Sequence, residues 1–560
     1  MICSRGKYRT LLFMLLAALC FSTVGEASST TAKNVIVLIA DGCSAEQFTL
    51  ARWIKKEALS LDRVLVGAVK THIADSVVAD SAPAATAYAT GVRTFDKCIG
   101  VGPDCLSGSD STSGSAVCRP MATVLEGAKL LGKATGIVVT SRISHATPAA
   151  FAAHVPHRGR EEDIAEQIVY QNIDVVFGGG SEYLLPMNAG GKRNDGENLM
   201  NVLKKRGVRI VGTAQEMADV HSGSVYGLFS KGHMPAEIDR QNTAPGVPSL
   251  PSMTRKALEI LSQDPDGFFL MVEGSQIDWA CHANDPAHMI GDVLAFEEAA
   301  SVCLKFAEEN GRTLVLALSD HNTGGFSIGN YRTSFSYSQI TTEQLLDPLT
   351  KMGASAFMLW KRIEQKRTPE QVVSVVKNGW GMTIRPEDGA AVLARADRYR
   401  AYGTPHYALG EILCPEYTCI GWSTHGHTGG DVPLYAYGPK SPAGVLDAPD
   451  VGRLCAQAMG FDLERTTRRL YADVQEVLPH AGVMLDRKKP ANPVLRVQVG
   501  HVRYRFFLNK NRMVTPDSVI TLEAPVIYMA ESRRAYLPMQ ALGLMEPGLL
   551  PLPDIEANSS

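Results

Sequence analysis

Short apolar runs rich in Val, Ile and Leu alternate with amphipathic stretches between about residues 34 and 460. The clearest predicted strands span residues 34–40, 134–140, 268–272 and 313–319. Apolar residues at helical spacing predict helices at residues 121–131, 161–171, 253–262 and 292–309. This alternation indicates an α/β fold with a mostly parallel central sheet and helices on both faces. Ligands of such sheets bind at the carboxyl ends of the strands.

Three regions depart from this pattern. Residues 100–115 are rich in Gly, Ser and Asp and are predicted to form a surface insertion. Residues 331–417 contain one predicted helix, at 369–377, and are interpreted as an accessory region. Beyond residue 490, hairpin strands are predicted at 494–502, 504–509 and 519–527. The predicted organisation is therefore a leader at 1–27, a catalytic domain at 28–490 and a small β-rich module at 491–560.

The first residues predict export. Arg5, Lys7 and Arg9 precede an apolar run at 11–21, and small residues follow, with cleavage expected after Ala27. The run is short for a membrane span, although an uncleaved anchor is the alternative. A lipid-attached cysteine is rejected because the bulky Leu19 precedes Cys20. We expect the protein in the periplasm, in the cell envelope or outside the cell.

The chain has 11 cysteines, of which nine remain once the leader is removed. An oxidising compartment favours disulfides, and the odd number leaves at least one thiol unpaired. Short-loop candidates are Cys98–Cys105 and Cys414–Cys419, with Cys118 competing for the first pair. No CxxC pair occurs, which argues against zinc held by thiolates. The net charge of −3 and the absence of a basic run argue against nucleic acid as a partner.

Carboxylates follow three of the predicted strands directly. Asp41, Glu273 and Asp320 each come at or just after a strand end. Each alone is more often a helix cap or a turn residue. Three carboxylates at one sheet edge would repel one another, however, and bound cations remove that repulsion.

Histidines accompany these carboxylates. Asp278 and His282 are four residues apart, so one helical turn places both on the same face, although such a pair is commonly a surface contact. His427 precedes another apolar run, and His425 is the competing candidate. Asp, Glu and His ligands without cysteine suit zinc together with a harder cation such as magnesium.

Ser81 is the candidate nucleophile. Small residues follow it, which suits a helix N-terminus that a phosphate group can approach closely. The alternative is a simple helix cap. A serine hydroxyl needs a base or a metal to become a good nucleophile, and candidate metal ligands are plentiful in this chain.

Five segments in order resemble the motifs of the alkaline phosphatase family, over about residues 34–459. They are Asp80-Ser81-Ala82 through Gly91, His145-Ala146-Thr147-Pro148-Ala149 with Arg158, Val272-Glu273-Gly274 through His282, Ser319-Asp320-His321, and His427-Thr428-Gly429.

The resemblance implies three metal sites. One zinc ion is expected on Asp278, His282 and His427, and a second on Asp41, Asp320 and His321 next to Ser81. Magnesium is expected on Asp41, Thr147 and Glu273.

The resemblance also implies the reaction, the hydrolysis of small-molecule phosphate monoesters. Ser81, activated by one zinc, attacks phosphorus; the other zinc neutralises the leaving oxygen and then activates water against the phosphoserine. Arg158 clamps two phosphate oxygens, and Asp80 lies beside the nucleophile. His145 and Trp279 stand where well-known bacterial members carry Asp and Lys. We therefore expect a third site that is less strictly magnesium and tolerates cobalt, the alternative being that both residues only pack.

Three other functions compete with this interpretation. A sulfatase needs Arg at the position of Ala85 for formylglycine formation, and a phosphodiesterase suits the Arg158 clamp less well. A non-catalytic surface protein is the third, because residues 494–543 faintly resemble the N-terminal module of copper amine oxidases. That module leaves association with the cell envelope open, and the family resemblance leaves a homodimer open.

Overall fold

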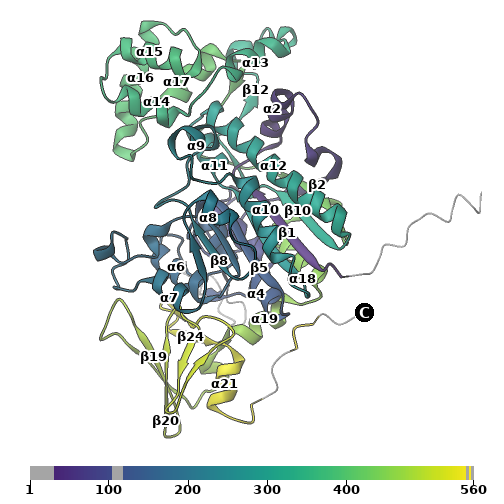
Figure 1. Ribbon diagram of the computed structural model, residues 1–560, viewed down its shortest axis with the longest axis vertical. Helices are drawn as coiled ribbons and strands as arrows, with labels where there is room; N and C mark the ends of the chain where they lie inside the picture. Colours follow the sequence, from purple (N-terminus) through teal and green to yellow (C-terminus); the bar gives the residue numbers. More distant parts are fainter. Residues whose placement is uncertain (1–30, 104–117, 550–553, 557–560) are drawn as a thin grey trace, which may run out of the picture.

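The computed structural model describes residues 31–103, 118–549 and 554–556. Figure 1 shows three parts along the long axis: a helical region, a central sheet covered by helices, and a small β-rich part at the opposite end. The predicted leader and most of the predicted 100–115 insertion lie outside the described residues. No helix in the described part of the chain is long and apolar enough to cross a membrane.

The central sheet has ten strands in the order β16-β2-β15-β10-β1-β9-β5-β6-β8-β7. Among these ten strands, only β15 runs antiparallel to its neighbours. The predicted mostly parallel sheet is thus confirmed. The strands are β1 Asn34–Ala40, β2 Leu65–Lys70, β5 Ala134–Arg142, β6 Val175–Gly179, β7 Arg209–Val211, β8 Val225–Leu228, β9 Phe268–Gly274, β10 Thr313–Leu318, β15 Val432–Tyr437 and β16 Gly444–Asp447.

Strand β1 lies at the centre of the sheet, and its side chains enter two hydrophobic cores. Val35, Val37 and Ile39 belong to the core on one face, whereas Ile36 and Leu38 belong to the core on the other. Successive side chains of a strand point to opposite faces, so a strand that is apolar throughout needs cover on both sides.

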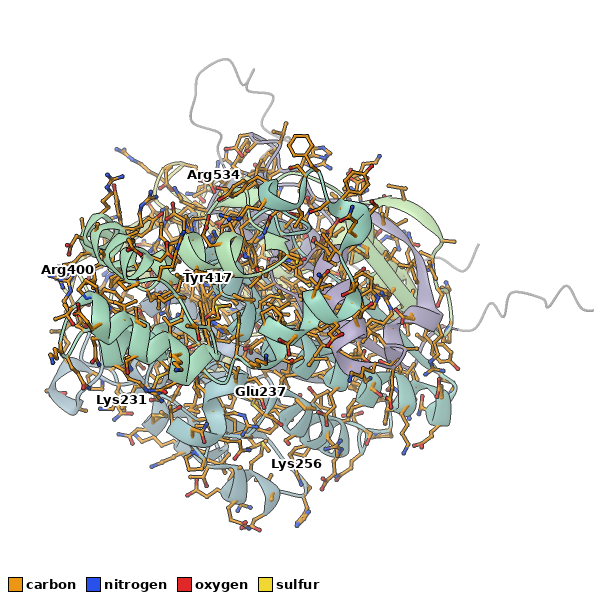
Figure 2. All side chains as sticks on the ribbon, turned by 90° about the horizontal axis from the view of Figure 1, so that it is seen from above. Lys231, Glu237, Lys256, Arg400, Tyr417 and Arg534 are labelled. Atoms are coloured by element: carbon orange, nitrogen blue, oxygen red, sulfur yellow. The ribbon has the colours of Figure 1, made fainter. Side chains whose placement is uncertain are left out.

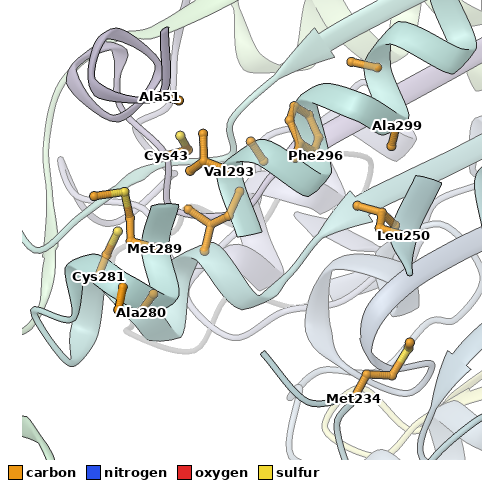
Figure 3. Close-up of a cluster of buried hydrophobic side chains, with 14 of the residues drawn as sticks. Cys43, Ala51, Met234, Leu250, Ala280, Cys281, Met289, Val293, Phe296 and Ala299 are labelled. Carbon is orange, nitrogen blue, oxygen red and sulfur yellow. The ribbon is translucent and has the colours of Figure 1, made fainter. Parts of the chain in front are cut away.

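Helices supply that cover. One face packs against α2 Ala45–Lys55, α10 Leu250–Leu261, α11 Gln276–His282 and α12 Pro286–Asn310. Figure 3 shows Met289, Val293 and Phe296 of α12 beside Ala51 of α2. The other face packs against α3 Ser81–Thr90, α4 Val124–Leu130, α5 Ala146–Ala150, α6 Glu161–Tyr170, α7 Leu199–Lys205 and α18 Ala448–Met459.

The accessory region contains five α-helices rather than the single predicted one. They are α13 Thr342–Thr350, α14 Ala356–Ile363, α15 Pro369–Trp380, α16 Pro386–Tyr399 and α17 Tyr407–Tyr417. Their apolar faces pack together around the fully buried Trp380, whose indole N–H donates to the Ala354 carbonyl at 2.9 Å. Short helices with weak individual patterns are stabilised by such packing, which explains why local sequence missed four of them.

The C-terminal part forms two small sheets. The five-stranded antiparallel sheet consists of β18 Gly482–Asp486, β19 Val494–Val499, β20 Val502–Phe507, β21 Arg512–Val514 and β22 Val519–Thr521. β23 Ile527–Met529 and β24 Arg534–Leu537 join β17 Ala472–Asp473 in a second sheet. The predicted strand at 519–527 is therefore two strands in different sheets, and β18 pairs with β19 across the predicted boundary at residue 490.

Disulfides are not formed among the cysteines that the structure describes. The predicted Cys414–Cys419 bond is absent, since the Cys414 thiol contacts the Asn284 carbonyl and the Cys419 thiol contacts the Gln344 carbonyl. Cys105 lies outside the described residues, so the Cys98–Cys105 pair stays a prediction.

Candidate active site

Three adjacent strands deliver the predicted carboxylates to one edge of the sheet. Ile39 near the end of β1 is level with Glu273 in β9 and with Leu318 at the end of β10. Asp41 and Asp320 follow their strands by one and two residues, so Asp41, Glu273 and Asp320 converge, and all three are fully buried.

Several oxygen atoms of this cluster have no hydrogen-bond partner among the described residues. They are both carboxylate oxygens of Asp41, Oε1 of Glu273, Oδ2 of Asp320 and the hydroxyl of Thr147. A buried polar atom without a partner costs roughly 1–3 kcal/mol, and more if it is charged. The concentration of such atoms at predicted ligands indicates that the cluster is built to hold cations.

The electrostatics of the cluster agree. Burial, followed by the neighbouring charges of Asp320, Asp278 and Glu273, raises the pKa of Asp41 well above its usual value. Burial also raises the pKa of Glu273 to about 7 and that of Asp320 to about 7. Without a nearby cation, Glu273 and Asp320 therefore keep their protons up to about pH 7, where ordinary carboxylic acids have already released them.

Asp278 and His282 come from α11, and His427 comes from β14 His427–Thr428; each offers a ligand atom within 4.8 Å of the others. Nε2 of His282 is 3.3 Å from Oδ2 of Asp278 and 3.2 Å from Nε2 of His427. Nδ1 of His282 donates to the His425 carbonyl, and Nδ1 of His427 donates to the Ala79 carbonyl at 2.8 Å. A carbonyl can only accept, so both rings carry a proton on Nδ1 and present Nε2 to the group.

The second group consists of Asp41, Asp320 and His321, whose ligand atoms also lie within 4.8 Å of one another. Nε2 of His321 is 3.5 Å from a carboxylate oxygen of each aspartate. The Thr323 hydroxyl donates its proton to Asp278 at 2.6 Å and therefore accepts from Nδ1 of His321 at 3.2 Å. His321 thus also presents Nε2. Thr323 was not singled out from sequence, since an isolated threonine carries no signal.

The third group contains Asp41, His145 and Glu273. Thr147, predicted to be a ligand here, lies near enough to Glu273 to affect the pKa of its carboxyl, and the buried Thr147 hydroxyl has no hydrogen-bond partner among the described residues. Sequence placed His145 only beside the site, whereas the structure puts a ring nitrogen of His145 within 4.8 Å of the two carboxylates.

Ser81 is the first residue of α3, and Asp80 is its N-cap. The Ser81 side chain lies against the second group, with Oγ 3.2 Å from Nε2 of His321. Nη1 of Arg158 donates to both carboxylate oxygens of Asp80, at 2.7 and 2.8 Å, and Nη2 donates to Nε2 of His145 at 3.0 Å. Arg158 is therefore held in a fixed orientation beside Ser81.

An aromatic cluster lies beside the third group. The rings of His145 and Trp279 are 5.3 Å apart, and His233 packs edge-on against Trp279 at 4.1 Å. The Arg142 backbone N–H donates to Nδ1 of His233 at 3.2 Å. Sequence reasoning missed His233, because it lies in a loop without any motif of its own.

Metal loading should depend on pH. Because the pKa values of Glu273 and Asp320 are raised to about 7, both carboxyls hold protons below that pH and must release them to bind a cation. We expect zinc affinity of the metal-free protein to fall by about tenfold per pH unit for each proton released below pH ~7. Competition titration with a zinc indicator measures this, and an affinity unchanged between pH ~5.5 and ~8 would contradict it.

The same shifts predict how the metal-free fold responds to pH. The folded-state pKa values lie above the ordinary values of about 4, so folding takes up protons between about pH 4 and 7. The contribution of these carboxyls to stability is therefore lost as pH rises through that range, and bound cations should abolish the loss. Thermal melts with and without zinc provide the comparison.

Comparisons with known proteins point to one family. The family model for alkaline phosphatase matches residues 32–460. Alkaline phosphatase 3 of Bacillus subtilis is 34% identical over 458 residues, covering 77% of this chain and 90% of the relative. The structure of Thermus thermophilus alkaline phosphatase matches with a TM-score of 0.68 and 28% identity, covering 82% of this chain and 95% of the other.

A third neighbour carries a substitution. It is a mutant alkaline phosphatase from the Antarctic bacterium TAB5, in which one histidine is replaced by aspartate and magnesium is bound in the M3 site. It matches with a TM-score of 0.54 and 27% identity, covering 77% of this chain and 98% of the other.

Proposed function

We infer how the residues of this chain hydrolyse phosphate monoesters. The starting point is that the chain belongs to the alkaline phosphatase family. The proposal is a phosphoserine intermediate on Ser81, two zinc sites and a third site of the magnesium type. The first zinc site uses Asp278, His282 and His427. The second zinc site uses Asp41, Asp320 and His321, and the third uses Asp41, Glu273 and Thr147, with His145 as a further ligand once its ring is free of the Arg158 N–H that Nε2 accepts here.

The observation that carries this proposal is the shared orientation of three histidines. His282, His321 and His427 each place a proton on Nδ1 through an oxygen acceptor and turn Nε2 toward buried carboxylates. In zinc-binding histidines, a hydrogen bond from the ring nitrogen that does not bind the metal fixes the tautomer and the orientation of the ring. Zinc ions held there would supply Lewis-acid chemistry that lowers the pKa of the serine hydroxyl and neutralises the leaving oxygen.

Ser81 and Arg158 then have distinct roles. The Ser81 oxygen forms a bond to phosphorus as the bond from phosphorus to the alcohol oxygen breaks, and the alcohol leaves with a proton. Water subsequently attacks the phosphoserine, which releases inorganic phosphate and restores the hydroxyl. The guanidinium of Arg158, held by Asp80, is positioned to donate two hydrogen bonds to terminal phosphate oxygens.

Replacing Arg158 tests the substrate class. A monoester offers more free terminal oxygens than a diester, so we expect Arg158→Ala to lower kcat/KM for an aryl phosphate by about 10- to 100-fold. Hydrolysis of a diester, already slow, should change far less. Assays of a monoester, a diester and a sulfate ester side by side measure this. Equal losses for all three esters, or faster diester hydrolysis by the unmodified protein, would contradict a monoesterase.

His145 is expected to change which metal ions the third site prefers. An imidazole nitrogen is a softer ligand than the oxygens that magnesium prefers. We therefore expect His145→Asp to bind magnesium about tenfold more tightly, and the unmodified protein to accept cobalt there. The TAB5 mutant, with its aspartate and bound magnesium, supports this direction. Magnesium titration of the metal-free variants is the measurement, and identical affinities would contradict a ligand role for His145.

A further inference from the structure

His425 and His282 form a reciprocal pair. Nδ1 of His425 donates to the His282 carbonyl at 2.7 Å, and Nδ1 of His282 donates to the His425 carbonyl. The two contacts fix the ring of His282 and the position of its backbone together. His425, the competing candidate ligand, belongs to none of the metal-binding groups found among the described residues.

The ring of His425 is in turn held by the accessory region. Tyr407 of α17 stacks on it with ring centres 5.2 Å apart and an interplanar angle of 20°. Tyr399 of α16 packs edge-on at 5.3 Å. Nε2 of His425 is 3.5 Å from Oε2 of Glu411 in α17. Nδ1 therefore donates to the catalytic domain, whereas Nε2 lies beside a carboxylate of the accessory region without forming a hydrogen bond to it.

Glu411 is itself fixed in place. Its carboxylate accepts a hydrogen bond from the Tyr399 hydroxyl at 2.6 Å and pairs with Arg395. Both partners lie on α16, so Glu411 joins α16, α17 and the ring of His425. A side chain with this many partners has little freedom, so the Glu411 carboxylate keeps a fixed position beside the ring of His425.

Helix α17 also lies directly against the residues that follow His282. A Cβ atom on Gly410 would approach the Asn284 carbonyl oxygen to 2.2 Å, so only glycine permits this packing. At the start of α14, the Ala356 N–H donates to Asp285 at 2.6 Å. Figure 2 looks down on this end of the molecule, where Arg400 and Tyr417 mark the ends of the accessory helices.

We propose that His425 is a positioning residue that holds His282 in its metal-binding orientation, and that the accessory helices α16 and α17 act on the metal centre through it. The inference rests on the proposed zinc site of Asp278, His282 and His427. The accessory region would then slow the loss of this one ion, because it keeps a ligand from turning away.

The test is zinc dissociation from the loaded full-length protein into excess chelator. We expect His425→Ala to release one zinc ion about 10- to 100-fold faster than the unmodified protein, with the other ions unaffected. His425→Asn should recover most of the loss, because an asparagine amide can donate from about the position of Nδ1. A purely structural contribution would change the melting temperature without this selective release or this rescue.

Glu411→Gln is the second variant, which keeps the shape of the side chain and removes its charge. It should also speed release of the same ion, to a smaller extent. Asp397→Asn is the matched control, because Asp397 lies on α16 but pairs with Arg367, at 2.6 Å, on the exposed side. The control should release zinc at the unmodified rate. If His425→Ala does not fold, the rate of zinc release from Glu411→Gln decides whether the proposal holds.

Asp278→Asn separates the two ways in which the proposal can fail. If that substitution removes no zinc, the zinc site in the proposed function is wrong, and this inference fails with it. If Asp278→Asn removes one ion, but His425→Ala and Glu411→Gln both release that ion at the unmodified rate, only the positioning role is overturned. The positioning role is supported if His425→Ala speeds the release of one zinc ion and this effect disappears when Asp278→Asn is added.

Discussion

Ser81→Ala should abolish nearly all turnover of an aryl phosphate, with a loss in kcat on the order of 10⁴-fold or more. The substitution removes the only atom of this side chain that can form a bond to phosphorus. The hydroxyl contacts Nε2 of His321 at 3.2 Å and is almost fully buried, so its loss should change the free energy of unfolding by no more than about 1 kcal/mol. Steady-state kinetics and thermal melts measure the two effects.

Two controls make the Ser81 result specific. The variant should retain the zinc content of the unmodified protein, because Ser81 is not among the predicted ligands. In a rapid-quench experiment with labelled substrate, only the unmodified protein should carry label on the serine. Retention of more than about a tenth of the activity by a folded, zinc-loaded variant would mean that another group attacks phosphate.

Asp278→Asn is expected to have the second-largest effect, a loss of one zinc ion and a fall in activity of at least about 10³-fold. Asp278 carries the negative charge between His282 and His427, with distances of 3.3 and 3.6 Å to their Nε2 atoms. Asparagine has nearly the same shape, so Thr323 can keep a partner while the charge disappears. Elemental analysis of the purified protein gives the zinc content.

The matched control is Asp219→Asn, which removes an exposed aspartate charge directly after α8 Ala214–Ala218, outside all the metal-binding groups of the described residues. It should leave zinc content and activity unchanged. If Asp278→Asn retained all of its zinc and lost activity only modestly, the group would have to be interpreted as a histidine cluster stabilised by hydrogen bonds, and the proposed zinc site would fall.

The chain sequence determined the sheet and the carboxylates at its edge. β1 was predicted at its observed bounds, because a run of buried branched residues leaves few alternatives to a central strand. Asp41 and Asp320 follow such runs directly, and parallel strands end at the same edge, so their convergence follows from local pattern alone. The family was likewise visible from five ordered motifs.

The choice between His425 and His427 depended on the tertiary structure. The two histidines are only two residues apart, in similar local sequence, and only contacts with distant segments distinguish their roles. His427 turns Nε2 toward Asp278, whereas His425 donates to the His282 carbonyl and lies beside Glu411 of α17. His145 likewise belongs to the third group only because folding brings a nitrogen of its ring near Asp41 and Glu273.

Four of the five α-helices of the accessory region were also not predicted from local pattern, since their stability comes from packing around Trp380 and against the carbonyl groups that follow His282. The positions of strands, the carboxylates that follow them and the spacing of motifs are properties of short segments, and the sequence determined them. Ring orientation, tautomer and side-chain partners depend largely on distant segments, as for His282, whose Nδ1 bonds a carbonyl 143 residues away, and His427, whose Nδ1 bonds one 348 residues away. Those were decided only when the chain had folded.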